Sequence, residues 1–458
     1  MNKKALIAIL VVVGVLAAGT LGFTVVKDIL IKRDPVNHLL YSMKKSNADA
    51  VDASYSGKIG VEKDMLTESF TYFVDEPEAM AEFVSSLISE VTFSGDIVMK
   101  ADLKKKEMFL LETVNINYSD EPLLQIGMSL DGEQMAINSE TLYDKSFVMS
   151  KQDLFDMIKE KNDIDLNEVD FDKYIDVLDM AKDPLFKKFL KESKAYEDII
   201  RDALKDLENE GDTTVLLKDG KEVKCDVLSL EISMDDMYDI YLDVAEEARD
   251  DQHLKALVEA KVLEMLNLFL ESEDYALLGV AEEDVNQMIQ DIESEFDNYW
   301  EDAMDEFISS FEMVQSDLAY TMGTDFTYEV EVAIDSKYRI RQMIASTDMM
   351  GITMEQKVVY NAYGDDVKTK DLALADESVN IVDLIEDPVK AEEVGLDVVD
   401  QALTNIIEGE ALSKLMADLE TKSEVLSETN RQSILDLVDY FFSNKDTLKD
   451  MILNSTGF

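Results

Sequence analysis

The sequence predicts an α+β protein in which an antiparallel sheet packs on helices, with a long helical hairpin inserted and a transmembrane helix at the N-terminus. Segments within residues 54–138, 213–232 and 326–360 alternate apolar and polar residues as strands do, and most of the remaining chain after residue 150 has helical spacing. Proline and glycine are scarce, at 5 and 17 residues. We therefore expect one ectodomain (35–385) with helical insertions (151–210 and 233–320), followed by a helical segment (391–458).

The transmembrane helix is predicted at residues 5–26, where the run from Ala5 to Val26 is uncharged and mostly apolar. At about 1.5 Å per residue, this run is long enough to cross a hydrocarbon core of roughly 30 Å. A cleaved signal peptide is the alternative, but the run is longer than a usual signal core, and no cysteine follows it for lipid attachment. We favour an uncleaved signal anchor in the cell membrane, with the bulk of the chain extracytoplasmic.

The composition argues against nucleic-acid binding and against a disordered chain. The 458 residues carry a formal net charge of −56, from 99 acidic and 43 basic residues, which disfavours nucleic acid as a partner. A hydrophobic content of 46% favours a folded chain over a disordered one. The single cysteine, Cys225, excludes an intramolecular disulfide, and we expect it to be a small half-buried strand residue.

The first strand region begins after a short amphipathic helix, predicted over Pro35–Lys45. Strands are predicted over Ser54–Glu62 and Val91–Asp102, and their shared S-G-x-I pattern suggests that they are neighbours. Between them, Glu76–Ser89 has helical spacing. Three more strands follow, with a turn at Asp131-Gly132: Glu107–Tyr118, Leu123–Leu130 and Gln134–Asn138.

Helical spacing then extends over Lys151–Glu210, with a break at Asp183-Pro184 and an end at Gly211. A hairpin of Thr213–Lys218 and Glu222–Ile232 follows around Asp219-Gly220. Ser233 is the predicted N-cap of the long helical block. Within it, an apolar stripe from Val285 to Leu318 is sustained for about ten turns, or roughly 60 Å, and favours a packed helical hairpin over a cofactor site.

The last strands are predicted over Phe326–Asp335, Tyr338–Ser346 and Ile352–Tyr360. Helical spacing returns in the tail, from Ala391 to Phe458.

No motif in the chain predicts catalysis or a bound cofactor. His38 and His253 are the only histidines and lie in no metal-binding pattern, so we expect solvated or capping roles for them. Asp163, Asp165 and Asn167 have the spacing of the first calcium-loop ligands, but Glu168 and Tyr174 replace the required glycine and glutamate. The sequence predicts no enzyme activity, no cofactor and no metal site.

Methionine is abundant, with 24 residues, and several lie in or beside the predicted strands. Because methionine adapts to irregular apolar surfaces, it suits a cavity that holds a hydrophobic ligand. Plain core filling is the alternative and the commoner role. The candidates for a ligand cavity are Met99, Met108, Met128, Met343 and Met354.

Residues Glu329–Val367, EVEVAIDSKYRIRQMIASTDMMGITMEQKVVYNAYGDDV, resemble the C-terminal strands of the LolA-like half-barrel family of envelope proteins, which includes the LppX- and LprG-type lipoproteins. The resemblance implies a curved antiparallel sheet with helices on its concave side, which holds an acyl chain or another apolar ligand. It also implies that Asp335 lies in a turn and Asn361 near the exit of the last strand. The segment from Gly220 to Val244 resembles membrane-anchored Firmicutes proteins, which implies a location but no activity.

Two functions remain open on the sequence. The first is an anchored envelope protein that binds a lipid or hydrophobic molecule in a cavity between sheet and helices. The second is a non-enzymatic structural or interaction protein of the envelope whose helical hairpin binds a protein partner of unknown identity. An open, roomy apolar cavity under the sheet favours the first, and a closed core under the sheet with an exposed apolar helix face favours the second.

Overall fold

In the computed structural model, the described residues are 34–102, 107–162, 166–178, 180, 183–275, 280–322, 326–349, 351–443 and 448–449. Their strands form one 12-stranded sheet in the order β12-β6-β5-β4-β3-β2-β1-β11-β10-β9-β8-β7. Its pairings are antiparallel, except that β12 runs parallel to β6. The α+β class and the antiparallel character of the sheet are thereby confirmed, with one parallel edge strand that the sequence did not indicate. The predicted anchor, residues 5–26, lies outside the described residues.

The N-terminal part supplies half of the sheet. Its helices are α3 (Pro35–Ser46), α4 (Lys63–Phe70) and α5 (Pro77–Ile88). Its strands are β1 (Ala50–Val61), β2 (Val91–Asp102), β3 (Glu107–Tyr118), β4 (Glu121–Asp131), β5 (Gln134–Asn138) and β6 (Ser146–Ser150). The predicted strands are confirmed here, while α4 and β6 were not predicted.

The helical stretch that follows is broken into short pieces. These are α6 (Lys151–Asn162), the 3-10 helix η1 (Leu166–Glu168), α7 (Phe171–Leu178), α8 (Pro184–Glu192) and α9 (Lys194–Ala203). The predicted break is confirmed, because the Asp183 carboxylate caps α8 by accepting from Leu185 N at 2.7 Å. The predicted helix end at Gly211 is wrong. Gly211 lies inside β7 with φ +102° at a register shift, where a residue without Cβ fits a bulge.

The second half of the sheet surrounds the long helical insertion. The strands are β7 (Glu208–Leu216), β8 (Glu222–Ser233), β9 (Thr327–Asp335), β10 (Ile340–Met349) and β11 (Ile352–Tyr363), and the helices between β8 and β9 are α10 (Met234–Asp250), α11 (Gln252–Glu271) and α12 (Glu282–Met322). Ser233 caps α10 as predicted, since its Oγ accepts from Asp236 N at 3.0 Å.

The prediction of an uninterrupted ten-turn helix over the apolar stripe is wrong, because the helix is kinked. The backbone of α12 leaves helical geometry at Glu295, with φ −133° and ψ 15°. The preceding Ser294 Oγ donates to Gln290 O at 2.7 Å, and such back-bonding to the i−4 carbonyl bends helices. Because no proline or glycine marks the position, the apolar period alone did not indicate it.

The C-terminal part closes the edge of the sheet and continues as helices. Its elements are the 3-10 helix η4 (Gly364–Asp366), β12 (Ser378–Asn380), α13 (Ile381–Glu386), α14 (Pro388–Glu408), α15 (Glu410–Lys422), the 3-10 helix η5 (Ser423–Val425) and α16 (Glu428–Ser443). The predicted helical tail is confirmed as far as the chain is described.

The largest core belongs to the helices, not to the sheet. Buried apolar residues of α8, α10, α11 and α12 form one cluster, centred on the fully buried Trp300, whose Nε1 donates to Arg249 O at 2.8 Å. Within this cluster the apolar stripe of α12 is buried from Val285 to Ile308. The predicted packed hairpin is therefore confirmed, and the stripe is covered by its own neighbours over that length.

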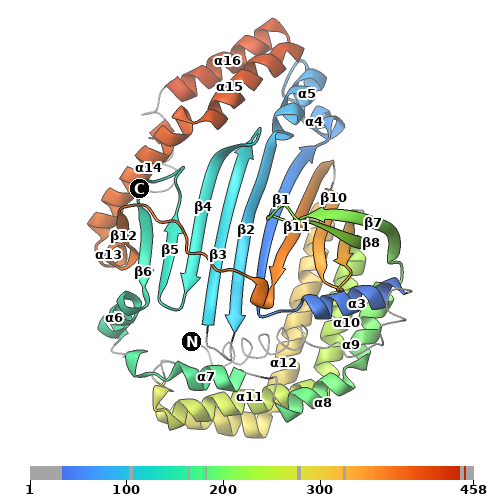
Figure 1. Ribbon diagram of the computed structural model, residues 1–458, viewed down its shortest axis with the longest axis vertical. Coiled ribbons are helices and arrows are strands. Elements are labelled where there is room, and N and C mark those ends of the chain that lie inside the picture. The colour runs from blue at the N-terminus through green and yellow to red at the C-terminus, as the bar shows by residue number, and fades with distance from the viewer. Residues whose placement is uncertain are drawn as a thin grey trace.

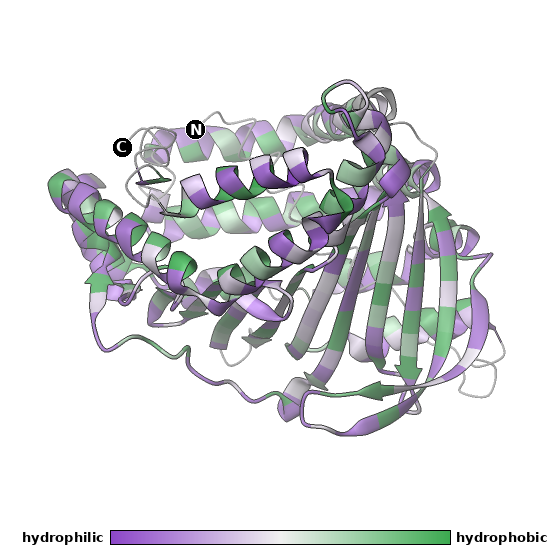
Figure 2. Cartoon of the chain, turned by 90° about the horizontal axis from the view of Figure 1, so that it is seen from above, coloured by the Kyte–Doolittle hydropathy of each residue, from purple (hydrophilic) through white to green (hydrophobic). Residues whose placement is uncertain are grey.

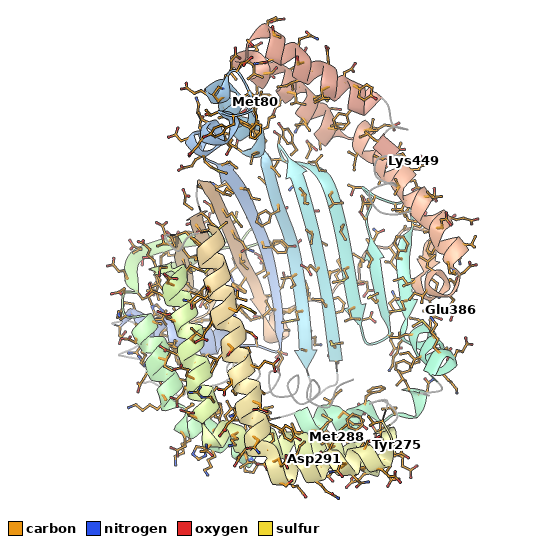
Figure 3. The ribbon with its side chains drawn as sticks, turned by 180° about the vertical axis from the view of Figure 1, so that it is seen from behind. Met80, Tyr275, Met288, Asp291, Glu386 and Lys449 are labelled. Carbon is orange, nitrogen blue, oxygen red and sulfur yellow. The ribbon has the colours of Figure 1, made fainter. Side chains whose placement is uncertain are left out.

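The helices stand around the sheet rather than over its centre. Figure 1 shows α13 to α16 along one side, α4 and α5 at one end of the strands, α7, α8 and α11 at the other, and α3, α9, α10 and α12 beside β7 to β11. In Figure 3, from behind, Met80 on α5, Glu386 on α13 and Met288 on α12 mark the same frame, and β2 to β4 are again uncovered. Figure 2 shows the curvature of the sheet and the alternation of apolar and polar bands along its strands.

Candidate functional site

Strand pairing gathers apolar side chains on one face of the sheet. Directly paired residues share a face, so Met99 on β2, Leu110 on β3, Leu130 on β4 and Met135 on β5 form one continuous row. We call this surface the apolar face. It comprises Ala53, Tyr55 and Ile59 on β1; Phe93, Ile97 and Met99 on β2; Met108, Leu110, Val114 and Ile116 on β3; Leu124, Ile126, Met128 and Leu130 on β4; Met135 and Ile137 on β5; Phe147 and Met149 on β6; Met354 and Val358 on β11; and Met343 on β10.

This face is half-buried in its middle and exposed toward both ends of its strands. Met108 is 56% exposed, Met99 45% and Met354 44%, and Ile59 and Ile116 are also exposed. The helices that contact it do so near strand ends. Tyr118, the last residue of β3, donates its hydroxyl to Asp418 Oδ2 on α15 at 2.9 Å, and Ser85 Oγ on α5 donates to Val61 O at the end of β1 at 2.7 Å. An apolar surface thus lies open between the helices that frame the sheet.

The five methionines predicted as cavity candidates all lie on the apolar face. Met99, Met108 and Met354 are exposed, and Met128 is half-buried. Met343 differs from the other four, because it packs against the small core that α3 forms on β8 to β10. Tyr360 OH lies 3.6 Å from its Sδ. Four of the five candidates therefore surround open surface, and the fifth borders a closed core.

Two aromatic rings lie flat across the centre of this face. Phe93 pairs directly with Gly57, and Tyr55 pairs directly with Gly95. A Cβ atom on Gly57 would lie 2.0 Å from Phe93 Cζ, and one on Gly95 would lie 2.5 Å from Tyr55 Cζ. Each glycine therefore makes room for the ring opposite it.

Ser56 pairs with Ser94, so the two S-G-x-I segments begin opposite each other on neighbouring antiparallel strands. The sequence echo thus predicted neighbouring strands correctly, and its glycines have a packing reason. Tyr55 OH continues across β2 and donates to Thr113 O at 3.0 Å.

The opposite face of the same strands is polar and carries its own cover. Ser54 Oγ donates to Asp96 Oδ1 at 2.7 Å, and Asn361 Nδ2 donates to Ser54 Oγ at 3.0 Å. Lys218, at the tip of the β7–β8 hairpin, reaches this network through an ion pair with Asp96 at 2.8 Å. Figure 1 also shows the segment after η4 crossing β3 and β4 on its way to β12, and Asn138 Nδ2 holds it by donating to Ala373 O at 3.1 Å.

A buried ion pair holds the turn between β9 and β10. Arg341 Nε donates to Asp335 Oδ2 at 2.9 Å, and both side chains are 5% exposed. Arg341 Nη1 also donates to the carbonyls of Tyr360 and Asn361, at 3.1 and 3.2 Å. Burial alone would raise the pKa of Asp335, but hydrogen bonds from the backbone N–H of Arg339 and from Arg341 outweigh it and lower that pKa. Asp335 is the last residue of β9, and Asn361 lies near the end of β11.

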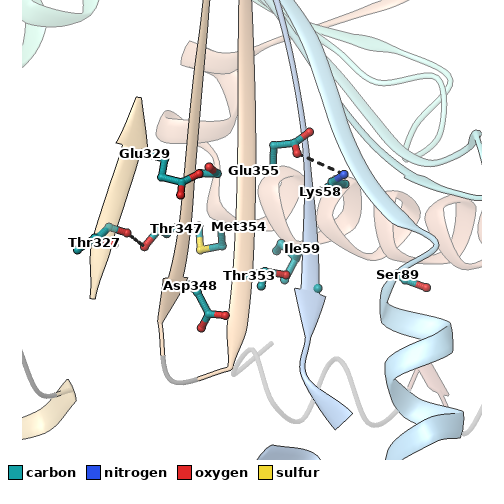
Figure 4. A pocket seen from close by; sticks show the side chains of 12 residues that line it. Lys58, Ile59, Ser89, Thr327, Glu329, Thr347, Asp348, Thr353, Met354 and Glu355 are labelled. Carbon is teal, nitrogen blue, oxygen red and sulfur yellow. Dashed lines mark hydrogen bonds and ion pairs between the residues drawn. The ribbon is translucent and has the colours of Figure 1, made fainter. Parts of the chain in front are cut away.

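Figure 4 shows a pocket at one end of the apolar face, with a volume of about 570 Å³. Ile59 and Met354 line it on the apolar side, and Ser89, after α5, lies across from them. Lys58 and Glu355 form an ion pair of 3.3 Å at its rim. The pocket therefore lies at one end of β1, β10 and β11 and is lined by residues from both faces of the sheet.

The two histidines both lie in helices, in different surroundings. The expectation of a solvated or capping His38 is wrong, because it is 1% exposed in α3, with Nε2 3.9 Å from Asp226 Oδ2 and its ring edge-on to Tyr338. Half-buried His253 lies in the first turn of α11, where its backbone N–H donates to Asp251 Oδ1 at 2.7 Å.

Cys225 is more buried than predicted, and burial, with the nearby Asp335 charge, raises the pKa of its thiol to about 11. Of the calcium-like spacing, Asp163 and Asp165 lie outside the described residues. In the described part of the chain, no cluster of histidine, cysteine or acidic side chains has a geometry that could hold a metal ion.

Sequence reasoning missed three features of this surface. The flat packing of Tyr55 and Phe93 over glycines was signalled only by the S-G-x-I echo. The hairpin and the crossing segment that cover the polar face depend on long-range contacts, for which the local pattern carries no signal. Glu112, a carboxylate on the apolar face directly opposite Ile97 and Met128, breaks the alternation of β3 and could have been noticed as an anomaly.

No described helix is long and apolar enough to span a membrane. Compared with protein-family models, curated proteins and solved structures, the chain has no match.

Proposed function

We propose that this is a membrane-anchored extracytoplasmic protein of the cell envelope, and that its apolar face binds the hydrocarbon part of a lipid or another hydrophobic molecule. The observation that carries the proposal is the accessibility of Met99, Met108 and Met354 on one continuous apolar surface. Contiguous exposed apolar surface is uncommon on soluble proteins and usually marks a binding site.

A ligand on the apolar face would remove apolar surface from water. Covering apolar surface contributes about 25 cal/mol per Å², so a long hydrocarbon chain laid across several strands gains several kcal/mol. Methionine side chains suit this role, because they are flexible and adapt to chains of different shape. The flat rings of Tyr55 and Phe93 add a smooth floor between them.

The location rests on the sequence. The apolar run from Ala5 to Val26 supports an anchor, and the half-barrel resemblance of Glu329–Val367 supports an envelope protein with an apolar ligand. A tethered binder takes its ligand from the membrane that holds it. Fusing a compartment-sensitive reporter to the C-terminus tests the orientation, and a reporter active in the cytoplasm would overturn it.

Photo-cross-linking in the membranes of the host tests the ligand directly. A benzoylphenylalanine at Met108 in the full chain lies on the apolar face, whereas one at Glu107 lies on the opposite face of the same strand. We expect lipid adducts by mass spectrometry for position 108 and few for position 107. Equal labelling at both positions, or no small-molecule adduct at position 108, would overturn the proposal.

One observation supports a second function, in which the helical hairpin binds a protein partner. The α12 stripe is buried up to Ile308, but Met313 is 61% exposed, and Val314 and Tyr241 are exposed on α12 and α10. These residues leave a small apolar surface at one end of the hairpin, which suits a protein partner. The same photo-reactive residue at Met313 would give protein adducts if the hairpin binds a partner, and none if it does not.

A further inference from the structure

The apolar face carries one carboxylate in its middle. Glu112 pairs with Ile97 on β2 and Met128 on β4, and its neighbours along the same face of β3 are Leu110 and Val114. Over the described residues of β1 to β6, the only other charged side chain on this face is Glu121, at the end of β4. Glu121 has a countercharge, since Lys414 Nζ on α15 lies 2.9 Å from it.

Glu112 has no such partner among the described residues. None of their hydrogen bonds or ion pairs includes it, and its side chain is half-buried on the apolar face. The Glu112 charge also affects Tyr55. Burial raises the pKa of the Tyr55 hydroxyl most, and the Glu112 and Asp96 charges raise it further. The Tyr55 hydroxyl is itself committed to Thr113 O, so its hydrogen does not serve the Glu112 carboxylate.

A ligand that lies across this face removes water from Glu112. Covering an ionised carboxylate with hydrocarbon is strongly unfavourable unless the ligand supplies a hydrogen-bond donor or an opposite charge. A carboxylate or phosphate on the ligand would add like-charge repulsion, and a neutral chain would leave the carboxylate without a partner. A protonated amine satisfies both requirements with a charge-assisted hydrogen bond.

We infer that the ligand of the apolar face is a cationic amphiphile, with a protonated amine that binds Glu112 and a hydrocarbon chain that lies along the methionine-lined strands. This inference rests on the proposed function. From Glu112 the apolar face extends roughly 17 Å to the start of β3, past Met108, and roughly 20 Å to the end of β3, so it accommodates a long alkyl chain. The net charge of −56 acts in the same direction, because it attracts cations and repels anions.

Three probes with one chain and three head groups test the inference. Octadecylamine, octadecanol and octadecanoate are titrated against the full chain held in detergent micelles, with wild type, Glu112→Gln, Glu112→Asp and Glu107→Gln compared. Glu107→Gln is the matched control, because it removes a carboxylate from the opposite face of the same strand.

We expect wild type to bind the amine about ten-fold more tightly than the alcohol, and the acid most weakly, as suits a charge-assisted contact. Glu112→Gln should lose this preference while its affinity for octadecanol stays unchanged or rises, and Glu112→Asp and Glu107→Gln should keep it. A wild-type protein that binds the three probes equally, or a Glu112→Gln variant that keeps the amine preference, overturns the inference and leaves the proposed function intact. Failure of all three probes to bind overturns the proposed function itself.

Discussion

The helical insertion and the N-terminal half of the sheet use the same kind of residues in opposite ways. In α8 and α10 to α12, apolar side chains meet each other, and Val285, Ile292 and Trp300 are at most 1% exposed. In β1 to β6, equally apolar side chains line up on one face, yet Met99 and Met108 remain about half exposed. The first region closes its core, and the second leaves its apolar surface open.

Under the proposed function, this difference separates the residues that stabilise the fold from the residues that bind the ligand. A closed core stabilises the fold through burial and close packing, so its residues tolerate little change in volume. An open face contributes little to stability and is free to accept a ligand. Helices that frame the sheet produce this arrangement, because most of their apolar residues pack against one another and α3 packs only on β8 to β10.

The largest predicted effect tests the closed region. Trp300→Ala removes a fully buried side chain and its hydrogen bond to Arg249 O. We expect a loss of about 4 kcal/mol in the free energy of unfolding, measured by chemical denaturation of the full chain. Tyr72, which is 83% exposed, provides the control, and Tyr72→Ala should change stability by less than about 0.5 kcal/mol. Similar losses for the two variants would contradict the contrast between closed and open regions.

The buried ion pair beside the sheet should give the next largest effect. Arg341→Leu leaves the Asp335 carboxylate buried with fewer donors, and we expect it to lower the unfolding free energy at neutral pH by about 3 kcal/mol. Arg341→Lys should lose less stability, because it keeps the charge but not the guanidinium contacts to the Tyr360 and Asn361 carbonyls.

The pH dependence of this variant has a definite sign. Because the folded-state pKa of Asp335 is lowered, its contribution is complete above the unfolded pKa of about 3.9 and is lost as the pH falls through the folded pKa. Removing Arg341 raises that folded pKa. We therefore expect the stability difference between wild type and Arg341→Leu to shrink in acid, and a difference that stays constant from pH 7 to pH 3 would refute this account.

A third, smaller effect is expected within the apolar face, at the contact between Gly57 and Phe93. Gly57→Ala places a Cβ against the Phe93 ring, which must lift from the sheet. We expect a loss of about 1–2 kcal/mol in unfolding free energy, as for other overpacked sites, and recovery of part of it in Gly57→Ala/Phe93→Ala. Gly132 has open space around it, so Gly132→Ala is the matched control and should be nearly neutral. Equal effects at the two glycines would show that the ring does not lie across Gly57.

Much of this architecture could be predicted from local pattern. The alternation in Val91–Asp102 and Glu107–Tyr118 predicted β2 and β3, and the cap at Ser233 and the break at Asp183-Pro184 were correct because each depends on neighbouring residues. The kink at Glu295 and the bulge at Gly211 were missed. The spacing of apolar residues does not indicate a serine hydroxyl that bonds to the i−4 carbonyl, or a shift in strand register.

The site was predictable in part for the same reason. The methionines could be assigned to strands and therefore to one face, but their exposure depends on where distant helices pack. The spacing of apolar residues also could not predict that the apolar stripe of α12 is buried while the apolar face of β3 is partly exposed. In both elements the apolar residues recur at the period of their own secondary structure. Burial of His38 likewise depends on the contact of α3 with β8 and the turn after β9.

The smallest expected change in stability is the sharpest test of the open region. Met99→Ser and Met108→Ser, alone and combined, replace exposed side chains that pack against few neighbours, so the unfolding free energy should change by less than about 0.5 kcal/mol per site. Binding of octadecylamine by the full chain should nevertheless weaken several-fold in the double variant, because each substitution removes apolar contact area from the ligand. Met288→Ser, in the closed helical core, is the converse control and should destabilise the protein without changing the affinity of the folded fraction. A double variant that loses stability as Met288→Ser does would mean that the apolar face is a covered core, and one that keeps full affinity would mean that the ligand binds elsewhere.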